Sequence, residues 1–202
     1  MKKIILAAFS LSLLACQSPT APAEPESQTP RLLAFVDSCL QANPEALNNE
    51  LTRSGFADNL KTAFMSYAGG SLPLLDSLPL QFAGLLEYPA NPYPDIELSQ
   101  YKNAGNVLVK FEAPLSSLER PGLSVSLQVF SILDKGTAST LKENEPYYLN
   151  GVFAGFADEF LLPSERVYTD YPSVVSTSDG CSVSLGTLVL DSLTCARTRS
   201  DT

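Results

Sequence analysis

Apolar residues just after position 30 recur at the period of an α-helix. A first helix is predicted from Arg31, because one helical face collects the apolar side chains Leu32, Val36, Cys39 and Leu40. Asn43-Pro44 is an N-cap followed by a proline at the first helical position, which predicts a second helix that ends at Gly55. A third short helix is predicted over residues 58–67, before the glycine pair at 69–70.

Prolines interrupt the next segment, residues 71–94. They oppose a long helix or a central strand, and they stand at Pro73, Pro79, Pro89, Pro92 and Pro94. The same segment is too apolar for free disorder. We therefore predict an irregular loop packed on the body of the protein, and the alternative is an apolar surface that binds a partner.

From about residue 95 the apolar residues follow the two-residue period of β-strands. Strands are predicted at 107–112, 123–133, 147–156 and 183–190. Turn residues separate them at Pro121-Gly122, Asp134-Lys135-Gly136 and Asp179-Gly180. Helices first and strands afterwards predict an α+β fold with a mostly antiparallel sheet.

Composition narrows the classes of function. The 202 residues are 45% hydrophobic, which suits one globular domain, and the formal net charge of −9 opposes nucleic-acid binding. The chain has no histidine, so Ser-His-Asp and Cys-His catalytic units and imidazole zinc sites are excluded. No cofactor or metal is predicted.

The N-terminus has the pattern of an export signal. Two lysines precede an 11-residue apolar run, residues 4–14, which is too short to span a bilayer as a helix. The sequence Leu13-Leu14-Ala15-Cys16 that follows resembles the lipobox of bacterial lipoproteins. The resemblance implies cleavage before Cys16 and acylation of its sulfur and its new amine. The alternative is an ordinary secretory signal that leaves Cys16 unmodified.

The residues after the lipobox bear on location and organisation. Residue 17 is Gln, where Asp retains enterobacterial lipoproteins in the inner membrane, so the resemblance implies an outer-membrane anchor facing the periplasm or the cell surface. Residues 17–30 are rich in proline and poor in large apolar side chains, as in an extended tether. The predicted organisation is therefore a signal peptide (1–15), a lipidated cysteine with its tether (16–30) and one α+β domain (31–202).

A second resemblance lies within residues 141–153. A polar turn leads there into a strand that is broken by Gly151, and the stretch looks like a mid-barrel strand of small OB-type barrels. In such strands glycine lets the backbone coil. The resemblance covers less than a tenth of the chain and implies a small OB-like barrel, beside which an open sheet or a sandwich stays an alternative.

Three cysteines remain after Cys16, and export would place them in an oxidising compartment. Cys39 lies on the apolar face of the first predicted helix, and Cys181 begins a predicted strand, so a bridge from helix to sheet is one prediction. The other is Cys181–Cys195, bracketing a hairpin centred near Gly186. Either pairing leaves one free thiol.

Candidate chemistry is confined to carboxylates and tyrosines. Acidic pairs that could act as the acid and base of a cell-wall hydrolase are Asp95 with Glu97, Glu143 with Glu145, and Asp158 with Glu159. A surface for an envelope protein or a glycan is predicted at Tyr88, Tyr93, Tyr147 and Tyr148. With no catalytic motif present, the sequence favours a lipid-anchored envelope protein with a binding or structural role. The alternatives are an acidic adaptor or inhibitor that docks a basic protein, and the hydrolase.

Overall fold

The computed structural model describes residues 30–76, 78–86, 106–116, 120–157 and 171–198. The first half carries the helices α1 (Arg31–Ala42) and α2 (Glu50–Met65) and the 3-10 turns η1 (Pro44–Leu47) and η2 (Pro73–Leu75). The strands that follow are β1 (Pro79–Leu86), β2 (Asn106–Ser116), β3 (Leu123–Asp134), β4 (Pro146–Phe156), β5 (Ser173–Thr177) and β6 (Gly180–Ala196), with the short helix α3 (Lys135–Ala138) between β3 and β4. The predicted α+β class is confirmed.

Asn43-Pro44, predicted to start the second helix, instead starts the 3-10 turn η1, and the rest of the second and third predicted helices is one helix, α2, which does not end at Gly55. Asn49 caps it, because its side chain accepts a hydrogen bond from the Thr52 N–H at 3.0 Å and its own N–H donates to the Thr52 hydroxyl at 3.1 Å. A mid-helix glycine costs only about 1 kcal/mol. The continuous buried stripe of Phe56, Leu60 and Phe64 outweighs that cost.

Part of the segment predicted as an irregular loop is the strand β1. Pro79 is its first residue, where a proline is tolerated in a sheet, and the side chains of Leu80 and Phe82 alternate into the core. The expectation of a loop was wrong here because the prolines were weighed without their position in the strand. Residues 87–94 lie outside the described residues.

Five strands form a ring. In order they are β1, β2, β3, β6 and β4, and β4 pairs back to β1. Every pairing is antiparallel except β3–β6, which is parallel. The strands β4 and β6 change register twice: opposite Gly151 the extra residue lies on β6, and before Gly155 it lies on β4. Strand β5 pairs with β6 beyond the ring.

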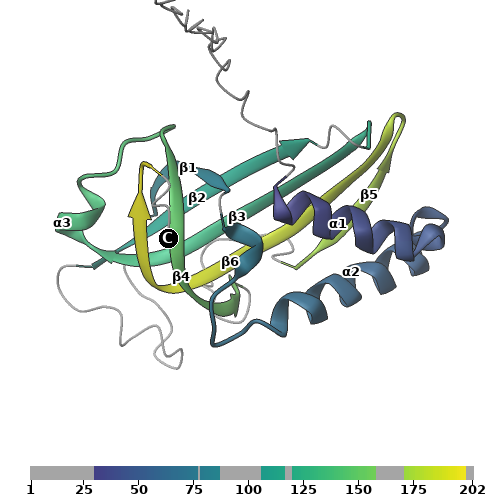
Figure 1. Cartoon of the computed structure of the whole chain (residues 1–202), viewed down its shortest axis with the longest axis horizontal. Coiled ribbons are helices and arrows are strands. Elements are labelled where there is room, and N and C mark those ends of the chain that lie inside the picture. The colour runs from purple at the N-terminus through teal and green to yellow at the C-terminus, as the bar shows by residue number, and fades with distance from the viewer. Residues whose placement is uncertain (1–29, 77, 87–105, 117–119, 158–170, 199–202) are drawn as a thin grey trace, which may run out of the picture.

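The larger of two apolar clusters of described residues fills the ring and continues under the helices. It includes residues of α1, α2, η2 and all six strands. Figure 1 shows α1 and α2 side by side against the part of the sheet that β3, β6 and β5 form. Phe35 of α1 and Phe64 of α2 meet edge to face with ring centroids 5.8 Å apart, and Phe64 also contacts Phe156 of β4. The helices are therefore held to the sheet by the same core that fills the ring.

Candidate functional site

The strand β5 has a free edge. It joins β6 through a two-residue turn at Ser178-Asp179, and within the described ranges it pairs with no other strand. Thr177 and Gly180 close this hairpin as a hydrogen-bonded pair, so the main-chain N–H and C=O groups of Val174 and Ser176 point away from β6. The edge thus presents unpaired backbone groups over the length of the strand.

Helix α2 runs along this edge and leaves an open groove of about 600 Å³. The helix side is formed by one face of its first two turns: Glu50, Arg53, Ser54 and Ala57. The strand side is formed by residues 172–176. The capping box at Asn49 fixes the first turn of α2, and therefore the positions of Glu50 and Arg53.

Both ends of the groove carry a cation. At one end the Leu47 carbonyl accepts from the Arg53 guanidinium and from the Ser176 hydroxyl, each at 3.5 Å, which ties η1 to α2 and β5. At the other end, one turn beyond Ala57, the Lys61 ammonium lies 3.3 Å from the centroid of the Tyr171 ring. The groove is thus bounded along its length by polar contacts between the helix and the strand.

The charge of Arg53 is not matched by a carboxylate. Its side chain is half-buried, and within the part of the chain that the structure describes it forms no ion pair. Other basic side chains, among them Arg31, Arg120 and Arg197, do pair with acidic ones. Glu50 is exposed at the rim, also without an ion pair to a described residue. A half-buried guanidinium whose carbonyl contact is long is able to bind an added anion.

Of the tyrosines predicted as a binding surface, Tyr147 does not lie at the surface. Tyr147 is buried in the core, and its hydroxyl accepts from the Lys142 N–H at 2.9 Å and from Arg197 at 3.4 Å. Its neighbour Tyr148 is half-buried, and Tyr88 and Tyr93 lie outside the described residues. Tyr147 was misassigned because strand alternation, which sends alternate side chains into the core, was not applied to this pair.

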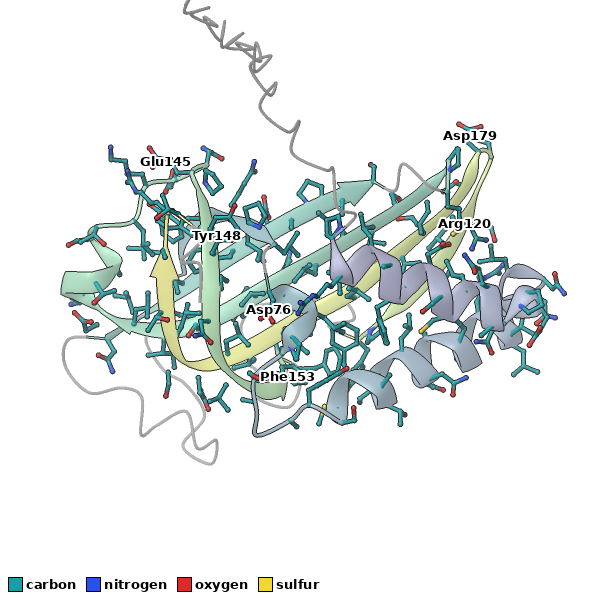
Figure 2. The ribbon with its side chains drawn as sticks, in the orientation of Figure 1. Asp76, Arg120, Glu145, Tyr148, Phe153 and Asp179 are labelled. Atoms are coloured by element: carbon teal, nitrogen blue, oxygen red, sulfur yellow. The ribbon has the colours of Figure 1, made fainter. Side chains whose placement is uncertain are left out.

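The same place holds one of the predicted acidic pairs. Glu145 binds Arg197 at 2.9 Å and Lys142 at 3.9 Å, so its charge is matched by two cations. The hydrogen bond to Tyr147, and then the charge of Glu145, raise the pKa of Arg197. Figure 2 places Glu145 and Tyr148 at the end of the molecule opposite to Arg120 and Asp179. The other two acidic pairs lie outside the described residues.

The hairpin predicted near Gly186 does not form. Residues 180–196 are the continuous strand β6, in which Gly186 has a φ of 73° beside a register shift against β3. Cys181 and Cys195 lie near opposite ends of this strand, and both are free thiols. A single glycine without a turn partner produced a bulge here rather than a reversal of the chain.

All three cysteines of the folded part are free thiols in the structure, and each has a raised pKa because of burial. For Cys195 burial raises the pKa to about 11. The charges of Arg120 and Asp37 also act on Cys181, which places this thiol near the ion pair between Arg120 and α1. The Cys39–Cys181 bridge stays a prediction, and Cys16 lies outside the described residues.

In the described ranges we find no helix with the length and apolarity to cross a bilayer, and no group of three or more acidic or cysteine side chains that could hold a metal ion. No protein-family model, curated protein sequence or solved structure matches this chain. The groove is therefore interpreted from its own geometry and charges.

The sequence contains signals for the groove that the pattern of helices and strands did not use. Asn49 and Thr52 are spaced as a capping box, which predicts the true start of α2. The β-branched pair Val174-Val175 stands between Pro172 and the turn residues Asp179-Gly180, which predicts a short edge strand.

Proposed function

We propose that this chain is a lipid-anchored protein of the bacterial cell envelope, and that its folded part binds a partner rather than catalysing a reaction. The lipobox-like sequence that ends at Cys16 supports the anchor, and Gln17 supports the outer membrane. The proline-rich segment 17–30 would let the folded part reach about 40 Å from the bilayer.

We also infer that the ring of five strands is an OB-type barrel. In favour are the Greek-key order of the strands and the two register shifts between β4 and β6. On this interpretation, β5, α1 and α2 are additions to the barrel. The groove between α2 and β5 is then a feature of this chain rather than of the barrel architecture.

The observation that carries the binding role is the groove itself, which joins a free strand edge to a half-buried Arg53 without a carboxylate. Catalysis has less support among the residues that the structure describes. Glu145, a member of a predicted acid–base pair, is bound in ion pairs with Arg197 and Lys142.

The anchor is tested with Cys16→Ser in the full-length protein. We expect the wild type to incorporate radiolabelled palmitate and to sediment with the outer membrane, and the variant to lose both properties. Cys195→Ser is the control, because it removes a thiol of the folded part and leaves the lipobox intact. Outer-membrane fractionation of Cys16→Ser would contradict the proposal.

The binding role is tested by a photo-reactive amino acid placed at Val175 in living cells. Val175 lines the groove and is 59% exposed, whereas Leu85 is 54% exposed on β1 and does not line it. We expect an adduct of one defined mass from position 175 and none from position 85. Equal adducts at both positions, or none at either, would contradict a binding role for the groove.

A further inference from the structure

We propose that the groove binds an extended segment of a partner protein, which adds as a strand to β5 and places an acidic side chain on Arg53. This inference rests on the proposed function and names the chemistry of its ligand. It combines three observations about the groove: its free edge, its length and its charge.

The free edge supplies the main-chain contacts. The N–H and C=O groups of Val174 and Ser176 point away from β6, and no hydrogen bond reaches them from the described part of the chain. An extended peptide forms main-chain hydrogen bonds with these groups in pairs, as when a strand adds to the edge of a sheet. Ligands that are not extended chains cannot repeat this pairing along the strand.

The length of the groove fits a short strand. The five residues of β5 extend about 16 Å, and the helix face from Glu50 to Lys61 rises about the same distance. A segment of about five residues would therefore lie along the outer edge of β5, beside the exposed face of the first turns of α2. Its side chains on one face would contact Ser54 and Ala57, which are small enough to leave room for it.

The charges favour an acidic residue in that segment. Arg53 and Lys61 stand at the two ends, while among the described residues Glu50, which is exposed, is the acidic one that lines the groove. Arg53 is half-buried with only a 3.5 Å contact to the Leu47 carbonyl, so a carboxylate would gain a charge-assisted hydrogen bond there. Tyr171 is the aromatic side chain at the Lys61 end of the groove, but the Lys61 ammonium covers one face of its ring, which argues against stacking of a sugar there.

The test uses the full-length protein in detergent and three fluorescent peptides. The first is acetyl-Ser-Val-Thr-Glu-Val-Ser-Val-amide, the second has Lys in place of Glu, and the third is the first with every second amide N-methylated. We expect the Glu peptide to bind at least about tenfold more tightly than the Lys peptide, and the N-methylated peptide not to bind. Equal binding of all three, or a preference for Lys, would overturn the proposal.

Two variants and one control locate the contact. Arg53→Gln should remove the preference for Glu over Lys, and Arg31→Gln, which alters an exposed arginine paired with Asp76, should leave it unchanged. Ser176→Pro removes an outward N–H and should abolish binding, while circular dichroism confirms that the fold is kept. Retained preference in Arg53→Gln, or its loss in Arg31→Gln, would overturn the proposal.

The outcomes separate this inference from the proposed function. If Val175 forms its adduct in cells while none of the peptides binds, the binding role stands and the acidic strand is the wrong ligand. If that adduct has the mass of two copies of this chain, the groove holds a second copy and the inference is overturned.

Discussion

The two ends of the molecule differ in whether their polar groups have partners among the described residues. At the closed end, where β1, β4 and the end of β6 meet, the Tyr147 hydroxyl accepts two hydrogen bonds and Glu145 binds two cations. At the open end, where β5 lies along α2, no described residue pairs with the outward main-chain groups of Val174 and Ser176, and no described carboxylate pairs with Arg53. Polar groups satisfied within the chain stabilise the fold, and those left unmatched are available to a ligand.

The open end is nonetheless as well packed as the closed end. Val174 of β5 is buried, and so are Phe56 and Phe64 of α2, all in the same cluster as Tyr147. The difference between the two ends therefore lies in their polar groups and not in the quality of the core. Substitutions should separate these contributions, and we order them by the size of the effect.

The largest effect is expected where β3 and β6 begin. Gly122 has a φ of 83°, and a Cβ added to it would overlap the Asp179 carbonyl. We expect Gly122→Ala to lower the free energy of unfolding by about 3–5 kcal/mol, since strain and overlap add. Urea denaturation measures this loss.

The matched control is Gly55→Ala, because a Cβ at this helical position meets no atom within 4 Å. It should raise the free energy of unfolding by about 0.5–1 kcal/mol. A similar loss in both variants would show that the close approach of β3 and β6 at Gly122 is not what makes this position sensitive.

At the closed end, Tyr147→Phe should cost about 1–2 kcal/mol of unfolding free energy. The change leaves the Lys142 N–H without its acceptor and removes a contact of Arg197. Tyr148→Phe is the control, because the Tyr148 hydroxyl has no hydrogen bond to a described residue. If both variants unfold at the same urea concentration as the wild type, the closed end is not stabilised by this network.

The smallest effect concerns Cys195, near the closed end. Its pKa of about 11 in the folded protein exceeds that of a thiol in the unfolded chain, so folding favours the neutral form. This contribution is complete below about pH 8.5 and is lost as the pH rises towards 11. We expect a loss of about 1 kcal/mol, since the thiol is only half-buried.

Denaturation of the wild type and of Cys195→Ala at pH 7, 9 and 10.5 measures the stability that is lost when the Cys195 thiol ionises. The variant should lose less stability over this range. Equal slopes would show that the Cys195 thiol does not contribute, and that other groups set the alkaline limit of the fold.

Periodicity alone predicted the α+β class and four of the six strands, because buried positions on β2, β3, β4 and β6 repeat with period two. Periodicity and breaker residues gave wrong boundaries where one residue type, glycine or proline, occurs both at the end and in the interior of an element. Gly55 was taken as a helix end and lies inside α2, and Pro79 was taken as a strand breaker and begins β1. In each case burial of the neighbouring apolar side chains in the core determined which structure formed.

The groove could not be predicted in the same way. It depends on β5 lying beside α2, two elements separated by more than 100 residues, and no local pattern encodes that contact. What the sequence does contain is the capping box at Asn49 and the short β-branched run before Asp179. Each predicts an element, and neither predicts their proximity.

The strand β6 has a consequence for the order of folding. It follows every strand that it pairs with, namely β3, β4 and β5, so the ring cannot close before residues 180–196 have left the ribosome. Pairings of such long sequence separation form slowly. The ring therefore stays open during synthesis, and its core is completed only when β6 pairs with the strands made before it.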